Sequence, residues 1–397
     1  MQLLLQTLCI LLTLEKTLCF LKAKPRNPEA NMNVSEMISY WGYPSEEYEV
    51  VTEDGYILSI NRIPNGKNDF SNSVPKPVVY LQHGFILTSG IWVANLPNNS
   101  LGFLLADAGY DVWMGNSRGN VYARKHVYMD PNSKEFWAFS FDQMIKYDLP
   151  ATIDFILQKT GQKQLYYVGH SQGTIIAFGA FSSNPQLAQK IKIYFALAPV
   201  CTARYITSAL RLFAFIPPPV FKLLFGEKDF LSPSQANYIG QFICQNEPLG
   251  TICNNILSLF FGYNPKNLNE SRMDVYLGQC PAGTSTQSML HNCQLINKGT
   301  FQAYDWGSPL LNMQHYNQTT PPFYKVENMK VPTVMWSGGR DTLSDPKDVA
   351  NLEPNISKLV YHKRIPDYNH IDFVIGLDAF YQVFSEILSF INKDQSH

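Results

Sequence analysis

The sequence predicts an α/β fold, in which a mostly parallel β-sheet is covered by helices on both faces. Short apolar segments rich in β-branched and aromatic residues alternate with segments whose apolar residues recur at helical spacing. Strands buried on both faces read as such apolar runs, because helices pack against each face of a parallel sheet. The alternation covers residues 20–200 and 326–397 but fails between them. We therefore predict one core interrupted by an inserted region, residues 201–325.

The individual elements follow from local patterns along the chain. Alternating polarity around Asp54-Gly55 predicts a hairpin over residues 46–63. Short apolar runs predict strands at residues 78–81, 110–114, 165–168, 191–197, 331–336 and 359–365. Helical spacing predicts helices at residues 147–159 and 173–181, from about residue 346, and near residues 377–391.

The composition excludes two classes of protein. The 397 residues include 31 Lys and Arg and 32 Asp and Glu, a net charge of −1, and only 16% of residues are charged. Disorder requires low hydrophobicity with high net charge, and a nucleic-acid partner requires a basic excess, so we expect neither. The low charge and the many aromatic residues favour a large core or contact with apolar material.

Residues 1–19 are predicted to be a signal peptide. The apolar run at residues 3–14 is too short to span a bilayer, and Thr17 and Cys19 provide small residues before a cleavage site near Phe20. The alternative is a buried N-terminal strand. Because no later segment has the roughly 18 uninterrupted apolar residues of a membrane-spanning helix, we expect an exported protein without a transmembrane segment.

The cysteines and the glycosylation sequons fit an oxidising compartment. Seven cysteines minus Cys9 and Cys19 leave five, none at the spacing of a zinc site: Cys201, Cys244, Cys253, Cys280 and Cys293. We expect one or two disulfides, an odd thiol and no bound metal. The sequons that are candidates for N-glycosylation begin at Asn33, Asn98, Asn269, Asn317 and Asn355.

The segment Gly169-His170-Ser171-Gln172-Gly173 matches G-x-S-x-G between a predicted strand and a predicted helix. A nucleophile elbow requires this context, because its serine stands on a tight turn and its small glycines allow close packing. The turn also points backbone N–H groups and the helix N-terminus at the attacked oxygen. We predict Ser171 as a nucleophile; the alternative is a serine in an ordinary glycine-rich turn.

A serine nucleophile requires a base, and in folds with this elbow the chain order is serine, acid, histidine. The late histidines are His362, His370 and His397. His362 lies within a predicted strand and His397 is the last residue, whereas His370 closes a loop before the last helix. We predict His370 as the base; the alternative is a helix-capping or solvent histidine.

The acid is predicted from its place after a strand. Asp341 follows the strand at residues 331–336 through a glycine-containing turn, at the sheet edge where ligands usually bind. We predict that Asp341 orients the base, with a structural turn aspartate as the alternative. Among its competitors, Asp345 and Asp348 resemble a helix cap and a first-turn helix acid, and Asp367 is the third.

Stabilising the negative charge on an attacked carbonyl requires two N–H donors. Gln172 supplies the first by its position after the serine. Phe85 is predicted to supply the second, with Gly84 as the alternative, because both follow the strand at residues 78–81. His83 precedes the serine, so we predict that it makes only a structural hydrogen bond.

Six segments are specific enough to be compared with a known family. They are Tyr40-Trp41-Gly42-Tyr43-Pro44, Glu53-Asp54-Gly55-Tyr56, residues 104–119 (LLADAGYDVWMGNSRG), residues 146–150 (KYDLP), the GHSQG motif and residues 304–307 (YDWG). They resemble the mammalian acid lipases, the gastric and lysosomal acid lipase group, and the resemblance extends from about Asn33 to the last predicted helix. The departures are Phe85 where the family often has Leu, Asn120-Val121-Tyr122 for Asn-Thr-Trp, and two cap cysteines.

The resemblance implies an α/β-hydrolase core with a helical cap over the site. It also implies hydrolysis of acylglycerols or steryl esters without a metal or an organic cofactor. The roles that it implies match those predicted for Ser171, Asp341, His370, Gln172 and Phe85. The cap disulfide of the family resembles Cys244–Cys253. Cys280 and Cys293, where many relatives carry other residues, are a second candidate pair that would leave Cys201 free.

These observations favour a serine lipase, secreted or lysosomal, that acts as a monomer on lipid esters at a lipid–water interface, with triacylglycerol-type substrates preferred. The alternatives are a steryl ester hydrolase, a short-chain carboxylesterase of the same fold and, remotely, a non-catalytic lipid-binding protein. Within the cap, residues 233–262 are apolar but interrupted by glycines and Pro248. We predict that they form a movable lid, which opens where its apolar side chains gain a lipid partner.

Overall fold

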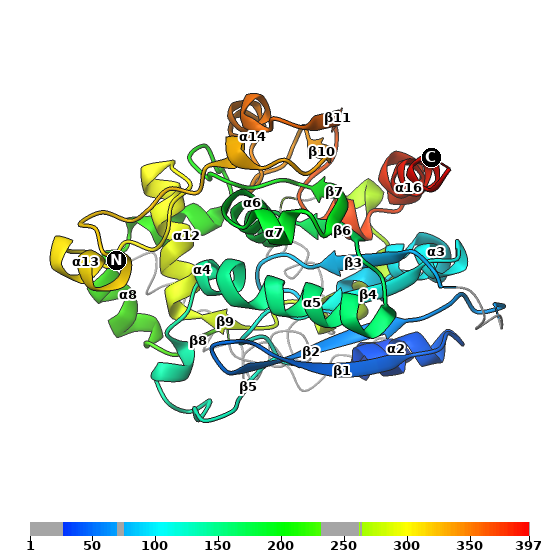
Figure 1. The fold of residues 1–397 in the computed structure, drawn as a ribbon, viewed down its shortest axis with the longest axis horizontal. Helices are drawn as coiled ribbons and strands as arrows, with labels where there is room; N and C mark the ends of the chain where they lie inside the picture. Colours follow the sequence, from blue (N-terminus) through cyan, green and yellow to red (C-terminus); the bar gives the residue numbers. More distant parts are fainter. Residues whose placement is uncertain (1–26, 70–74, 232–261, 263, 397) are drawn as a thin grey trace, which may run out of the picture.

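The computed structural model describes residues 27–69, 75–231, 262 and 264–396 (Figure 1). The predicted signal peptide, the predicted lid apart from Gly262, the pair Cys244 and Cys253, and His397 lie outside the described residues.

A nine-stranded sheet forms the centre of the described structure. Its strands are β1 (Glu46–Val51), β2 (Tyr56–Ile63), β3 (Val78–Gln82), β4 (Asp111–Gly115), β5 (Lys125–His126), β6 (Leu165–His170), β7 (Ile191–Leu197), β10 (Thr333–Gly338) and β11 (Leu359–Ile365). Eight strands follow the order β1-β2-β4-β3-β6-β7-β10-β11, and β5 pairs with β2. The pairings of β2 with β1, β4 and β5 are antiparallel, and those from β4 to β11 are parallel. The predicted hairpin and mostly parallel sheet are confirmed.

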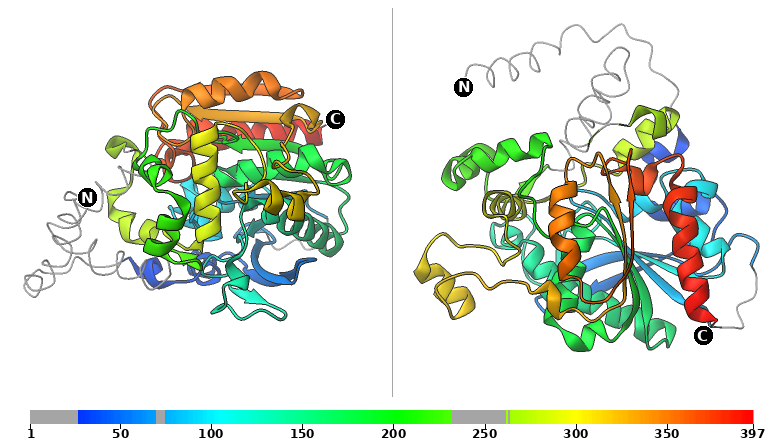
Figure 2. Two further views of the ribbon diagram at one scale, coloured as in Figure 1. Left: turned by 90° about the vertical axis from the view of Figure 1, so that its left-hand side faces the viewer. Right: turned by 90° about the horizontal axis from the view of Figure 1, so that it is seen from above.

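Helices cover both faces of the sheet, as the sequence predicts (Figure 2). Successive strand side chains point to opposite faces, so Tyr167 of β6 joins one buried cluster while Tyr166 and Val168 join the other. The helices of the first cluster are α5 (Leu149–Thr160), α6 (Gln172–Ser183) and α14 (Pro346–Leu352), and those of the second are α3 (Leu101–Asp107) and α16 (Ser385–Gln395). In the right-hand view of Figure 2, α14 and α16 lie on opposite sides of the strands.

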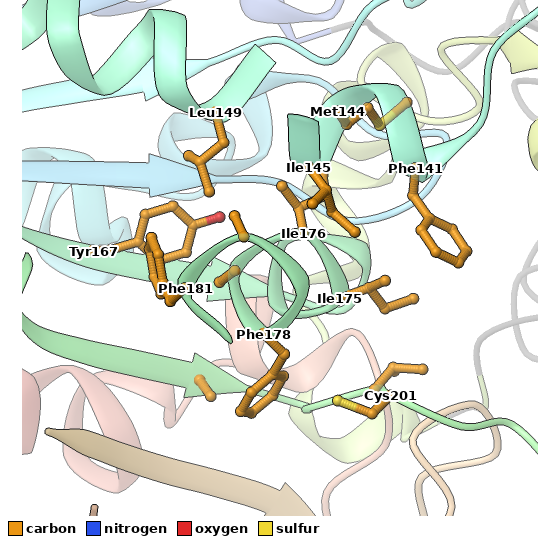
Figure 3. Packing of buried hydrophobic residues seen from close by; sticks show 14 of the residues in the cluster. Phe141, Met144, Ile145, Leu149, Tyr167, Ile175, Ile176, Phe178, Phe181 and Cys201 are labelled. Carbon is orange, nitrogen blue, oxygen red and sulfur yellow. The ribbon is translucent and has the colours of Figure 1, made fainter. Parts of the chain in front are cut away.

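Helix α6 is apolar on all sides and is buried along almost its whole length. Figure 3 shows Ile175, Ile176 and Phe178 pointing in different directions into the surrounding side chains. A helix that is packed on every side is held firmly, and its N-terminus directly follows β6.

The described part of the chain between β7 and β10 forms short helices and a two-stranded sheet. The longer helices and the two strands are the 3-10 helix η8 (Ala209–Phe215), α8 (Pro218–Phe225), β8 (Asp229–Phe230), α11 (Met273–Gly278), β9 (Thr284–Ser285), α12 (Thr286–Lys298) and α13 (Pro309–Tyr316). Helix α12 packs against η8 and α8, beside the first buried cluster. Several apolar side chains of η8 and α8 nevertheless remain exposed, which is unusual for a structural layer.

The predicted Cys280–Cys293 disulfide is wrong. Both residues, together with Cys201, are free and buried. Cys280 packs in the second buried cluster and Cys293 in the first. Burial raises the pKa of each of these two thiols to about 12.

Two helix starts also differ from the prediction. The π-helical turns Met144–Asp148 and Phe380–Phe384 precede α5 and α16. A π turn adds one residue to the helical repeat, and the spacing of apolar residues does not reveal that addition.

No helix in the described ranges is long and apolar enough to cross a bilayer. Within the same ranges, His, Cys, Asp and Glu side chains do not gather in groups of three or more that could hold a metal ion.

Candidate active site

Ser171 occupies the tight turn between β6 and α6, as the motif predicts. Its backbone angles are φ 53° and ψ −115°, a strained conformation for a residue with a side chain. Packing requires both glycines of the motif. A Cβ atom on Gly173 would lie 2.4 Å from the carbonyl oxygen of Gln82, and one on Gly169 would lie 2.8 Å from the backbone of Gly173.

The side chains of Ser171, His370 and Asp341 form one hydrogen-bonded chain. The Ser171 hydroxyl oxygen lies 2.7 Å from His370 Nε2. His370 Nδ1 lies 2.9 Å and 3.1 Å from the two carboxylate oxygens of Asp341. The three residues follow β6, β11 and β10, whose carboxyl ends meet at one edge of the parallel sheet. The structure therefore brings together the three residues that the sequence singles out.

Burial and further hydrogen bonds hold this chain in place. His370 and Asp341 are each 2% exposed, so little water competes for their hydrogen bonds. Asp341 Oδ1 also accepts the backbone N–H groups of Leu343 and Ser344, each at 2.8 Å. These donors fix the orientation of the carboxylate towards the imidazole ring.

Two residues that sequence reasoning missed position the loop of His370. His170 Nε2 donates a hydrogen bond of 2.9 Å to the His370 carbonyl oxygen. Burial, with a contribution from the neighbouring His370, holds the pKa of His170 well below its usual value, so its ring is neutral. On the other side, the Asp372 carboxylate accepts the N–H of Asn369 at 2.7 Å. The available signals were that His170 lies within the serine motif and that Asp372 lies two residues after the base.

The competing histidines have other partners. His83 donates from Nδ1 to the carbonyl oxygen of Gly84 at 2.7 Å, and its Nε2 accepts the N–H of Ser117 at 3.1 Å. Burial lowers the pKa of His83 to about 4, so this histidine is neutral and makes the structural hydrogen bonds predicted for it. His362 lies in β11, where its Nε2 is 2.8 Å from the Ser337 hydroxyl.

The competing carboxylates also have structural roles. Asp345 caps the N-terminus of α14, as predicted. Asp348 accepts hydrogen bonds from the loop that follows β7. Asp367 forms an exposed ion pair with Arg340. Asp341 is the one of these four that contacts His370.

The predicted N–H donors lie beside the serine. Phe85 and Gln172 both line the cavity that contains it. Gln172 is the first residue of α6, where backbone N–H groups have no partner within the helix. A Cβ atom on Gly84 would lie 3.0 Å from the serine Cβ, so this glycine lets the Phe85 turn approach closely. The turn is anchored where the N–H of Ala282 donates to the Ile86 carbonyl oxygen at 2.8 Å.

A cavity opens at Ser171 and His370. Its lining is largely apolar and includes Leu87, Ile175, Val200, Leu343, Ile206, Leu210, Met289 and Ile296. A cavity with this apolar lining suits hydrocarbon better than charged or sugar-like groups. The imidazole can take the hydroxyl proton as the oxygen attacks a carbonyl carbon held there.

Comparisons with known families agree with this geometry. Residues 77–377 match the family described as alpha/beta hydrolase fold, and residues 34–96 match the partial alpha/beta-hydrolase lipase region. Among solved structures, the chain is similar to a putative lipase from Sulfolobus solfataricus, with a TM-score of 0.60 and 15% identity over 94% of this chain and 100% of that one. A likeness at this identity shows the fold alone.

Closer relatives are found among curated proteins. The chain is 59% identical to gastric triacylglycerol lipase of Rattus norvegicus, over 94% of this chain and 95% of that protein. It is 56% identical to gastric triacylglycerol lipase of Homo sapiens, over 95% of each. It is 54% identical to lysosomal acid lipase/cholesteryl ester hydrolase of Macaca fascicularis, over 93% of each. The serine elbow, the parallel sheet and these identities together place the chain in the α/β-hydrolase superfamily, as a member of the gastric and lysosomal acid lipase family.

Proposed function

We propose that this protein is a serine lipase, a carboxylic ester hydrolase that acts on lipid esters. One observation carries the proposal: the Ser171 hydroxyl lies 2.7 Å from His370 Nε2 at the wall of an apolar cavity. The names of the close relatives, triacylglycerol lipase and acid lipase, support the same chemistry. A purely lipid-binding role is disfavoured, because the proposed nucleophile and base are hydrogen-bonded to each other, as proton transfer between them requires.

The reaction follows from the positions of the three side chains. Ser171 Oγ attacks the ester carbonyl carbon while its proton passes to His370 Nε2. His370 then gives this proton to the alcohol oxygen, the carbon–oxygen bond breaks, and the acyl group stays on Ser171. Water attacks the acyl-enzyme by the same route and releases the fatty acid. Asp341 keeps the imidazole oriented and stabilises its positive charge.

The negative charge of each tetrahedral intermediate requires donors. In the proposal, the backbone N–H groups of Gln172 and Phe85 donate to this oxygen. The N-terminus of α6, a helix of 12 residues, adds a favourable dipole at the same place. Phe85 stands where the family often has Leu. The different side chain reshapes the acyl entrance, whereas the backbone N–H donor is unaffected.

Triacylglycerols are the proposed preferred substrates, with steryl esters as the second candidate because one relative is named cholesteryl ester hydrolase. The proposed site of action is a lipid–water interface, met by the monomer after secretion or, alternatively, in lysosomes. In this proposal residues 20–200 and 326–397 form the catalytic core, and residues 201–325 form the cap.

A substrate panel tests the proposal. Purified protein is assayed from acid to neutral pH against emulsified trioctanoin, cholesteryl oleate and soluble methyl butyrate. We expect trioctanoin to give the highest turnover. Preference for cholesteryl oleate would favour the second candidate, and a folded protein that hydrolyses none of the three would contradict the proposed function.

A further inference from the structure

An open groove lies beside α13, the helix at the left-hand edge of Figure 1. It shares no described residue with the cavity that contains Ser171, so it is a separate feature of the molecule. Two segments of its lining are held together by backbone contacts. Gln302 and Phe323 form an antiparallel bridge, and the Ala303 N–H donates to the Pro322 carbonyl oxygen at 2.9 Å. These contacts make the groove a built part of the fold.

The groove suits an uncharged, polar ligand. Its two charged side chains, Lys298 and Asp305, form an ion pair with each other, so their charges are already compensated. Asp305 Oδ1 also accepts the Gly307 N–H and the Asn312 side-chain amide, each at 3.0 Å. The other small and hydroxyl-bearing residues of the lining are Ser308, Pro309, Thr319, Thr320 and Pro321. Hydroxyl groups both donate and accept hydrogen bonds, which matches the uncharged, hydroxyl-rich surface of a sugar.

Two further side chains of the groove can hold such a ligand. Phe323 is 60% exposed, and the negative face of its ring attracts the C–H groups of a sugar. Gln302 is 7% exposed, and its Nε2 has no hydrogen-bond partner among the described residues. A buried donor without a partner is unfavourable, and a ligand oxygen that accepts from it removes this penalty.

A glycosylation sequon ends in the same groove. Thr319, which lines it, is the third residue of the sequon Asn317-Gln318-Thr319. All three residues are exposed, whereas each of the other four sequons contains a buried or half-buried residue. In the described part of the chain the Asn317 carboxamide makes no hydrogen bond, and its backbone N–H ends α13 by donating to the Met313 carbonyl oxygen at 3.0 Å. The side chain is therefore free for modification at a fixed place beside the groove.

The carboxamides of three other sequons are already engaged. Asn33 accepts the Glu36 N–H at 2.9 Å, and Asn269 accepts the N–H and the hydroxyl of its own sequon residue Ser271. Asn355 donates from Nδ2 to the Asn351 carbonyl oxygen at 2.8 Å. A glycan at any of these positions would have to give up such a contact or point away from it, which distinguishes Asn317.

We propose that Asn317 carries an N-linked glycan whose first sugars lie in this groove. In the attachment step the Asn317 side-chain nitrogen forms a bond to C1 of the first sugar. The bond between C1 and the diphosphate oxygen of a lipid-linked oligosaccharide breaks, and the nitrogen loses one proton as the lipid diphosphate leaves. That donor is met in the secretory pathway, which fits an exported protein.

The groove lies within reach of the first sugars. Two residues of extended chain span at most about 7 Å, so Thr319 is close to the attachment point at Asn317. An N-acetylglucosamine ring over Phe323 presents its C–H face to the aromatic ring. Its acetamido oxygen can accept the hydrogen bond that Gln302 Nε2 offers. The glycan then covers an exposed aromatic side chain, while the apolar side chains of η8 and α8 stay uncovered.

The first experiment measures occupancy of the sequon. Full-length protein secreted by mammalian cells is digested with trypsin and treated with peptide N-glycosidase in ¹⁸O water, which converts a glycosylated Asn into labelled Asp. Mass spectrometry should find the label at Asn317. Thr319→Ala is the control: it keeps Asn317 but destroys the sequon, so the label should disappear from this position alone. An unlabelled Asn317 in wild-type protein overturns the proposal, whether or not the protein hydrolyses esters.

The second experiment asks whether the glycan lies in the groove. Native protein is treated with the same glycosidase, and the rate of glycan release is measured at each occupied sequon. Phe323→Ser should raise the rate at Asn317 roughly fivefold, because the enzyme acts on sugars that have left the groove. Gln302→Met, which keeps the length of the side chain but removes the donor, should raise it in the same direction.

Tyr381→Ser is the matched control, because Tyr381 is also an exposed aromatic residue but lies outside the groove. It should leave the release rate at Asn317 at the wild-type value. In the two groove variants the rates at the other occupied sequons should stay unchanged, which separates loss of the groove contact from general unfolding. Equal rates at Asn317 in wild type, Phe323→Ser and Gln302→Met would mean that the glycan points into solvent, and would overturn its placement in the groove.

Discussion

At the scale of single residues, the hydrogen-bond partners of each imidazole ring distinguish the proposed base from the histidines with structural roles. His370 lies between a hydroxyl and a carboxylate, whereas His83 lies between backbone groups. Chain order and position in a loop were enough to predict His370 and Asp341 from the sequence. The contact of His170 with the His370 carbonyl oxygen was missed, because no motif pairs these two groups and only the packing of the sheet brings them together.

Replacing the histidines individually tests this distinction. His370→Ala should lower kcat by roughly 10⁴-fold or more, because the serine loses the acceptor of its proton. His362→Ala is the matched control and should retain most of the activity, since its ring contacts Ser337 and not Ser171. The test is steady-state kinetics on methyl butyrate. A folded but inactive His362→Ala protein would contradict the assignment of His370 as the base.

At the scale of elements, the strands at residues 191–197 and 359–365 have the predicted bounds. The run at residues 191–197 is apolar because β7 lies between two parallel strands, whereas β11 is the edge strand and most of its side chains are half-buried or exposed. The π-helical turns before α5 and α16 were missed, since a single added residue leaves the apolar spacing on either side intact.

The loop between β11 and α16 contains a carboxyl group whose pKa makes stability depend on pH. Burial raises the pKa of Asp372 from 3.8 to about 6, although hydrogen bonds from Asn369, Asn264 and Asn267 oppose the rise. Because the folded pKa lies above the unfolded one, this contribution is fully present below pH ~4 and is lost as the pH rises through ~6. Its size is on the order of 3 kcal/mol.

Asp372→Asn removes this titration, because an amide stays neutral. The free energy of unfolding of the variant, relative to wild type, should therefore increase by roughly 3 kcal/mol between pH 4 and pH 7, as measured by urea denaturation. Asp305→Asn is a control: burial opposes the shift, but hydrogen bonds from Lys298 and Asn312 hold the pKa of Asp305 below its usual value. Its contribution to stability changes only below pH ~4, so the difference between this variant and wild type should stay nearly constant between pH 4 and pH 7. A constant difference for Asp372→Asn across this pH range would contradict the assignment.

At the scale of the whole molecule, the sequence predicted a core interrupted by residues rich in apolar side chains, but it did not show how those residues pack. The Cys280–Cys293 pair failed for this reason. The sequence offered Cys280 and Cys293 as a candidate pair, whereas the fold places Cys280, which follows α11, and Cys293, which lies in α12, in different buried clusters. Disulfide pairing inferred from the sequence does not account for these two clusters, because they arise from tertiary packing.

Exposed apolar side chains on η8 and α8 predict a surface that contacts lipid. Leu212, Phe215, Leu223 and Leu224 are 66%, 69%, 84% and 63% exposed. Replacing all four by Ser should lower the ratio of trioctanoin-emulsion to methyl butyrate activity at least about tenfold, because each side chain loses a favourable transfer into lipid.

The matched control uses exposed apolar residues on other elements. Val360 and Tyr381 are 59% and 76% exposed and lie in β11 and before α16. Val360→Ser with Tyr381→Ser should leave the emulsion to methyl butyrate ratio near the wild-type value. Equal losses in both sets of variants would mean that general surface hydrophobicity, rather than the η8 and α8 surface, brings the protein to lipid.

The central claim is that Ser171 is an activated nucleophile, and covalent labelling measures this most directly. Purified protein is treated with a p-nitrophenyl alkylphosphonate, and the modified peptide is identified by mass spectrometry. One adduct per chain is expected, on Ser171, with release of p-nitrophenol. The adduct should be absent from Ser171→Ala and should form far more slowly in His370→Ala. A folded protein that gives no adduct, or an adduct on another residue, would contradict the account.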